Sequence, residues 1–232
     1  MTLAPPALAR ALTPAVRMGL AISVATGLYG ISFGALAVAA GLTVAQACAL
    51  SALMFTGGSQ FAFVGVIGGG GAPAAATAAA SLLGVRNAVY GVQMNALLRP
   101  GWPRKLAQAH VTIDESVATA SSQEDPDEER RGFWTAGVGV WVLWNAFTLV
   151  GALAGDALGD PRAWGLDGAA VAAFLGLLWP RLHGRDPWAV AVVAAVVTVA
   201  VTPVVPAGIP IIVAAGVAAA MGVAQHRRGS AS

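Results

Sequence analysis

Hydrophobic residues fill long stretches of the chain, and short breaks rich in glycine, proline or charge separate them. One crossing of a bilayer takes about 20 residues in a helix. On that basis the pattern predicts seven hydrophobic segments, at residues 16–40, 44–67, 73–98, 133–155, 167–182, 187–204 and 208–224. We therefore predict an all-α fold, a polytopic transmembrane helical bundle of about seven segments that forms one domain over residues 1–232.

The distribution of charge favours lipid as the solvent of these segments. Charged residues make up 10% of the chain, and none lies between Arg17 and Arg86 or in the stretch 187–225. A water-soluble domain would need charges on the outward faces of such stretches. The net charge of +2 is too small to indicate nucleic acid, and the single Cys48 cannot form an internal disulfide.

A hydrophilic connector is expected at residues 99–132. Its part 123–131, QEDPDEERR, predicts a solvated loop. The preceding KLAQAHVTIDESVATA is too polar to span a bilayer, but its apolar positions suit one helix face. We expect it at the membrane interface or beneath the bundle, with Asp114 and Glu115 as solvated charges on different helix faces.

The basic residues predict an orientation in the membrane. With seven crossings, most of the loop arginines and Lys105 lie on the side of the C-terminus. The positive-inside tendency then places the C-terminus in the cytoplasm and the N-terminus outside. A re-entrant early segment would reverse the N-terminus, so both arrangements stay open.

A short repeat suggests internal symmetry. The sequence GALA occurs at residues 34–37 and again at 151–154, each time late in the first hydrophobic segment of a three-segment block. Two blocks of three segments, residues 15–98 and 133–204, would form an inverted repeat with broken helices, as in many transporters.

The stretch MFTGGSQFAF, residues 54–63, interrupts an apolar segment with glycines and an amide. A break at membrane depth leaves unpaired backbone groups unless they face protein or a water-filled cavity. We predict a non-helical interruption within residues 55–61 that faces the interior, with a helix restarting near Ser59 and its amides directed at an anion. Alternatively, Gly57 and Gly58 only allow a neighbouring helix to approach.

Two further positions are candidate functional residues. Arg86, followed by Asn87, falls near the middle of the third segment, where an arginine must face the interior and find a partner. It could contact an anion, form a gating ion pair or form a purely structural one. Asp167 begins an apolar segment and is either a helix N-cap or a group that binds an ammonium or a proton.

The sequence gives little support to an enzymatic function. His110, His183 and His226 lie far apart at segment ends, so no metal site is expected. Ser59 has no histidine in any hydrophobic segment to activate it, and the glycine run at 68–71 lacks the lysine of a phosphate loop. We expect no catalytic residue, no metal and no cofactor.

Several motifs together resemble the AzlC family of branched-chain amino-acid exporter permeases. They are the GGSQF motif at 57–61, LLGVRNAVYG at 82–91, TIDESVA at 112–118 and WGLDGAAVAAFLGLLWPRL at 164–182. The resemblance covers about residues 15–225. It implies a multi-pass bacterial inner-membrane exporter of leucine, isoleucine, valine or similar amino acids that works with a small hydrophobic AzlD-type subunit and binds no nucleic acid.

A zwitterionic substrate needs a positive partner, a negative partner and an apolar pocket. We expect the helix end at Ser59 and Arg86 to hold its carboxylate, with Gln60 orienting it. Carbonyls at Gly57 and Gly58, with Asp167, would hold its ammonium. The remaining predicted site residues are Phe55, Phe61 and Phe63 around the side chain and Asn87 beside Arg86. Alternatives are a membrane scaffold whose partner subunit transports, or a transporter of another small zwitterion or anion.

Overall fold

The computed structural model describes residues 12–158, 175, 178–179 and 182–229. Its regular elements over these ranges are helices. They are α2 (Pro14–Ala39), α3 (Val44–Leu53), α4 (Gly58–Gly68), α5 (Pro73–Leu98), α6 (Arg104–His110), α7 (Asp114–Ser121), α8 (Pro126–Leu158), α10 (Arg185–Val201) and α11 (Ile209–Gly229). The all-α prediction is confirmed for this part of the chain.

Local sequence signals explain where several helices begin. Thr13 accepts a hydrogen bond from the Val16 amide ahead of Pro14, the first residue of α2. Asp125 accepts from the amides of Asp127 and Glu128 at 2.9 and 3.0 Å at the start of α8. Side chains that satisfy the free amides of a first turn fix the position of that turn.

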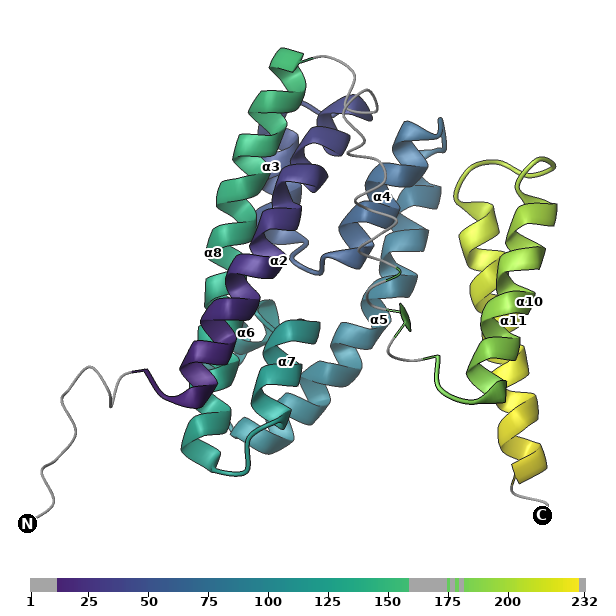
Figure 1. Ribbon diagram of the computed structural model, residues 1–232. Coiled ribbons are helices and arrows are strands. Elements are labelled where there is room, and N and C mark those ends of the chain that lie inside the picture. The colour runs from purple at the N-terminus through teal and green to yellow at the C-terminus, as the bar shows by residue number, and fades with distance from the viewer. Residues whose placement is uncertain (1–11, 159–174, 176–177, 180–181, 230–232) are drawn as a thin grey trace, which may run out of the picture.

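The α2 and α8 helices run side by side in the same direction over most of their length (Figure 1). Their contact is made by small residues. A Cβ at Gly34 would collide with the backbone of Thr148 and lie 2.6 Å from the nitrogen of Ala152. A Cβ at Gly27 would lie 2.6 Å from the Cβ of Leu143. Glycines let two helix backbones approach closely because no side chain keeps them apart.

The two GALA motifs meet in this interface. The backbone of Gly34 faces Thr148 and Ala152, and the backbone of Gly151 faces Ile31. Because α2 and α8 are parallel, residues 15–98 and 133–204 are not shown to form an inverted repeat, which would set their first helices antiparallel. The repeated sequence instead packs one long helix against the other.

The α3 and α4 helices form a hairpin that enters the bundle and turns back. Ser51 of α3 donates to Thr148 of α8 at 3.1 Å, and the chain then reaches Phe55 before reversing. At the far end of α4, Gly68 lies against Ala40, beside the start of the hairpin. Segment 44–67 therefore does not cross the bundle as one helix. The predicted interruption within residues 55–61 is confirmed, because α3 ends at Leu53 and α4 begins at Gly58.

The α6 and α7 helices form a second hairpin, which enters from the opposite end (Figure 1). Ile113, at its turn, belongs to the same buried cluster as Phe55 and Val140. The hairpin then runs back until Ser122 lies against Met18, near the start of α2. The turn at 111–113 and α7 thus pack inside the bundle, against α8 and α2, whereas α6 lies beside α5 with most of its residues exposed.

The remaining helices complete the arrangement. The 26-residue α5 runs the length of the bundle between the outer end of one hairpin and that of the other (Figure 1). The α10–α11 pair stands to one side, and α11 packs on α5. The predicted segments 16–40, 73–98, 133–155, 187–204 and 208–224 correspond to α2, α5, α8, α10 and α11. Most of segment 167–182 lies outside the described residues.

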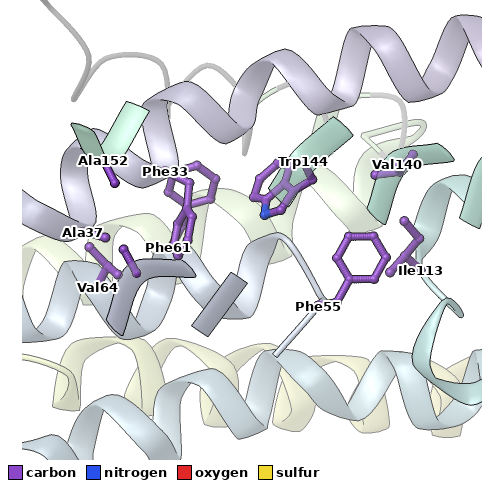
Figure 2. Close-up of a cluster of buried hydrophobic side chains, with 10 residues drawn as sticks. Phe33, Ala37, Phe55, Phe61, Val64, Ile113, Val140, Trp144 and Ala152 are labelled. Carbon is purple, nitrogen blue, oxygen red and sulfur yellow. The ribbon is translucent and has the colours of Figure 1, made fainter. Parts of the chain in front are cut away.

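Aromatic side chains hold the α3–α4 hairpin against the long helices (Figure 2). The ring of Phe33 lies 5.6 Å from that of Phe61 and 5.9 Å from that of Trp144, and all three are buried. Such edge-to-face and stacked pairs contribute about 0.5–1.5 kcal/mol each beyond their buried area. Phe61 therefore acts in the core of the fold.

The close contact between α2 and α8 predicts that substitution of its glycines lowers stability. Gly34→Ala should lower the free energy of unfolding by about 1–3 kcal/mol, because the new methyl overpacks the contact with Thr148 and Ala152. Gly216→Ala is the matched control: a Cβ there meets nothing within 4 Å, and the change should raise helix stability by up to about 1 kcal/mol. Thermal unfolding of both variants in detergent tests this, and an equal response of the two would contradict it.

Candidate functional site

A small cavity lies where the turns of the two hairpins approach each other. The α3–α4 turn and α7 supply most of its charged and polar wall, and α2, α5 and α8 close it. The lining residues are Thr26, Phe55, Thr56, Gly57, Gly58, Arg86, Ile113, Asp114, Glu115, Val140 and Trp144. Segments more than 50 residues apart in sequence thus meet at one place.

Arg86 of α5 connects both hairpins. Its Nη1 lies 2.7 Å from Oδ2 of Asp114, the first residue of α7. Its Nη2 donates to the carbonyl of Thr56 in the α3–α4 turn at 3.4 Å. The two side chains of the ion pair are 26% and 16% exposed, so the pair is largely shielded from solvent. The predicted inward-pointing Arg86 with an acceptor is confirmed.

The N-termini of α4 and α7 both lie at this cavity. In each helix the side chain of the third residue accepts a hydrogen bond from the residue before the helix: Gln60 Oε1 from the Gly57 amide at 3.1 Å, and Ser116 Oγ from the Ile113 amide at 3.0 Å. These bonds close the two breaks. The first amides of each helix keep their partial positive charge, which favours an anion or an acidic side chain at the helix end.

The hydrogen bonds of Gln60 differ from its predicted role of orienting a substrate. Its side chain is fully buried, and its Nε2 donates to the carbonyls of Leu50 and Ser51 at 3.1 and 3.4 Å. With Oε1 bound to Gly57, both ends of the amide are used inside the hairpin. Gln60 is therefore a structural clamp across the break, and it does not line the cavity.

Glu115 is the second carboxylate of the cavity. Its Oε1 accepts from Oγ1 of Thr26 at 3.4 Å. It belongs to the eight-residue α7, which turns back and is not a membrane-spanning segment. Burial raises the pKa of the Glu115 carboxyl, and the neighbouring Asp114 acts in the same direction. The backbone amide of Glu115, the Thr26 hydroxyl and the Arg86 charge oppose this shift.

Three lining residues hold polar atoms without a hydrogen-bond partner among the described residues. They are the Trp144 indole Nε1, the Arg86 Nε and the Thr56 Oγ1. Trp144 is only 3% exposed, so its unpaired N–H carries a desolvation cost of about 1–3 kcal/mol. Two donors and a hydroxyl beside a helix N-terminus form a suitable environment for a carboxylate or a water molecule.

The size of the cavity limits what it holds in this conformation. Its volume is about 40 Å³. A single water needs roughly 10–15 Å³ of such space, so the cavity has room for a few waters and not for a branched amino acid. Binding of a larger molecule requires the two hairpin turns to move apart.

The other predicted site residues are spread over the surroundings. Phe55, Gly57, Gly58 and Arg86 line the cavity. Ser59 is buried behind it, and Phe61 and Phe63 pack in the hydrophobic clusters.

Asn87 turns away from this cavity. It donates to the Thr112 carbonyl at 3.0 Å and lines a separate groove between α5 and α6, together with Lys105 and Gln108. Asp167 lies outside the described residues.

Asp114 and Glu115 were wrongly expected to be solvated. The reason is that the turn of this hairpin and α7 pack inside the bundle, which the polarity of residues 104–121 does not reveal. A usable signal existed, because the first 123 residues contain no other acidic residue that could pair with the central Arg86. Thr26, Val140 and Trp144 carry no comparable signal in the sequence.

Long apolar helices around an enclosed ion pair are typical of a helical membrane protein. Among the described residues, α2 and α8 are long and apolar enough to cross a bilayer by length and composition. A family model described as AzlC protein matches residues 21–158, more than half of the chain. The chain therefore belongs to the AzlC family, which is associated with membrane transport. No curated protein and no solved structure matches it.

The charge arrangement predicts unequal effects of two neutralising substitutions. Arg86→Gln leaves the Asp114 carboxylate without its cation, beside a second acidic residue, and should destabilise the protein by about 3–5 kcal/mol. Asp114→Asn should cost less, because removal of the Asp114 charge favours ionisation of Glu115, which can then compensate Arg86. Melting temperatures in detergent and the amount of folded protein in the membrane measure this difference.

The control is Arg130→Gln, which removes an exposed ion pair with Asp127 and should change stability by at most about 1 kcal/mol. A greater loss of stability in Asp114→Asn than in Arg86→Gln would contradict this prediction.

Proposed function

We propose that this protein is a secondary transporter that exports branched-chain or similar small apolar amino acids, with the cavity between the two hairpins as its central binding site. The observation that carries the proposal is the meeting of two hairpin turns, from opposite ends of the bundle, around the Arg86–Asp114 ion pair. Broken helices that face each other across a polar site are a recurrent design for binding small charged solutes inside a membrane.

The lining residues suit a zwitterion with an apolar side chain. The amide end of α4 at Gly58, with the unpaired N–H of Trp144, is suited to a carboxylate. The carboxylates of Asp114 and Glu115 are suited to an ammonium group. The apolar faces of Phe55, Ile113, Val140 and Trp144 are suited to an aliphatic side chain.

Alternating access would follow from movement of the hairpins. With a volume of about 40 Å³, the cavity is closed in this conformation. Each hairpin separates the cavity from one end of the bundle, so withdrawal of one hairpin at a time would open the site to one side only. Arg86, which contacts both turns, would exchange partners between the two open states.

The ends of the bundle differ in their number of basic residues, which supports an orientation. The start of α2 and the connections α5–α6 and α7–α8 lie at the same end (Figure 1). Basic residues of the described chain gather there: Arg17, Arg99, Arg104, Lys105, Arg130, Arg131 and Arg185. By the positive-inside rule this end faces the cytoplasm of a bacterial inner membrane. We therefore propose a multi-pass protein with its N-terminus inside, which replaces the external N-terminus expected from seven crossings.

A small hydrophobic AzlD-like subunit is the proposed partner. The bundle leaves large apolar side chains exposed on α2, α5 and α8, among them Val24, Val89 and Leu153, at 53%, 62% and 53% exposure. Lipid or a partner helix would cover them. The competing scaffold function assigns transport to that subunit alone.

Efflux of labelled leucine from proteoliposomes, with and without the small subunit, separates the two functions. Transport by this chain alone supports the transporter and excludes the scaffold. Transport by the small subunit alone, unchanged when this chain is added, would overturn the proposal. Parallel measurements with lysine and glutamate establish whether the site selects an apolar side chain.

The indole of Trp144 provides the sharpest test of the site. Trp144→Phe keeps the aromatic ring but removes the unpaired N–H, which should cost about 1.5–3 kcal/mol of binding to a carboxylate. The apparent affinity for leucine should fall about tenfold or more. Trp102→Phe is the matched control, because Trp102 is 74% exposed and outside the cavity. Unchanged leucine affinity in a folded Trp144→Phe variant would remove Trp144 from the binding site.

A further inference from the structure

The charged groups around the cavity do not balance. Arg86 is the single cation among the residues that line it, whereas Asp114 and Glu115 are both acidic. The guanidinium pairs with Asp114 at 2.7 Å. The Glu115 carboxylate accepts a hydrogen bond from the neutral hydroxyl of Thr26 at 3.4 Å. With both carboxylates ionised, the site carries one uncompensated negative charge.

The helices around Glu115 bring no cation other than Arg86 into the lining of the cavity. The described parts of α2 beyond Arg17, of α3 and α4, and of α8 between Gly132 and Gly155 contain no charged residue. On α5 the only charge is Arg86, and on α7 the other is Asp114. On α6, Arg104 and Lys105 are exposed and do not line the cavity, and the ring of His110 lies near those of Phe55 and Trp141, with centroids 6.2 Å from each.

A buried charge without a partner costs several kcal/mol, so such a group takes up a proton or a cationic ligand. The closed cavity of about 40 Å³ has no room for an amino acid. A proton needs no additional room. Burial and the adjacent Asp114 raise the pKa of Glu115, which favours its neutral form in the closed cavity.

We propose that the Glu115 carboxylate is a shared site at which a proton and the ammonium group of the transported amino acid displace one another. The proposal rests on the transport function proposed above. An ammonium group binds the ionised carboxylate and not the neutral acid, so substrate binding from the cytoplasm expels the proton, and a proton from outside expels the substrate. Each zwitterion that leaves is exchanged for one incoming proton, and one positive charge moves inward. Both the pH gradient and the membrane potential would then drive export.

Proton release on substrate binding tests this directly. Leucine is titrated into the purified protein, with its small subunit where binding requires it, in weakly buffered detergent solution with a pH indicator. The parent protein should release up to one proton per bound leucine below the pKa of Glu115 and none well above it. Over the same range its Kd for leucine should rise about tenfold for each unit by which the pH falls.

Glu115→Gln removes the proton site and keeps the shape of the side chain. This variant should release no proton at any pH and bind leucine at least tenfold more weakly, with an affinity that no longer depends on pH. Glu115→Asp should retain proton release with a shifted midpoint, which covers the case in which the glutamine variant does not fold. Glu124→Gln, in the exposed loop before α8, should behave as the parent protein does.

The outcomes separate this inference from the transport function. Leucine binding by the parent protein without proton release would overturn the shared site and leave the transporter intact. Full proton release by Glu115→Gln would also overturn it, because another group would then be responsible. If the parent protein neither binds nor transports leucine, the proposed function itself is overturned.

Discussion

Close contact between α2 and α8 is the constraint on which the rest of the structure depends. Gly27 and Gly34 on one helix and Gly151 on the other bring the two backbones together, and any larger residue would separate them. The paired helices form a continuous wall along the bundle. Against it both hairpins pack, one through Ser51 and the other through Ile113. Without this wall neither turn would be held where the cavity forms.

The hairpins solve the problem of placing polar groups deep inside an apolar bundle. Each break exposes backbone amides, and each is closed by a side chain three residues into the next helix, Gln60 in one and Ser116 in the other. Closure at these points satisfies some amides and leaves those of the first helical turn available to the cavity. Arg86 then joins the two turns through Asp114 and the Thr56 carbonyl, so the position of each hairpin depends on the other.

The sequence predicts the helices well and their directions poorly. Apolar runs mark α2, α5, α8, α10 and α11, because a helix in an apolar environment needs a long uninterrupted stretch. The break at Gly57 was also predictable, since two glycines and an amide interrupt an apolar run there, although close helix packing would have explained the glycines as well. The reversal of the chain at that break was not, because a kinked crossing and a hairpin have the same residues.

The candidate site was accessible from sequence only in part. Arg86 was identified because a central arginine requires compensation. Its partner Asp114 was missed, since residues 104–121 are polar enough to pass for a surface helix. Gln60 was assigned to the substrate because an amide in an apolar run indicates a ligand, yet its hydrogen bonds are all made within the hairpin. Trp144 was not identified, because no feature of the sequence around it distinguishes it from the other tryptophans.

The parallel pairing of α2 and α8 also determines the order of assembly during synthesis. More than a hundred residues separate Gly34 from Gly151, and both hairpins lie between them in the sequence. At roughly 5–20 residues per second, α2 emerges on the order of ten seconds before its partner helix exists. During that interval its row of glycines has no helix to receive it and faces lipid or the insertion machinery. The bundle therefore closes late, around hairpins that have already been made.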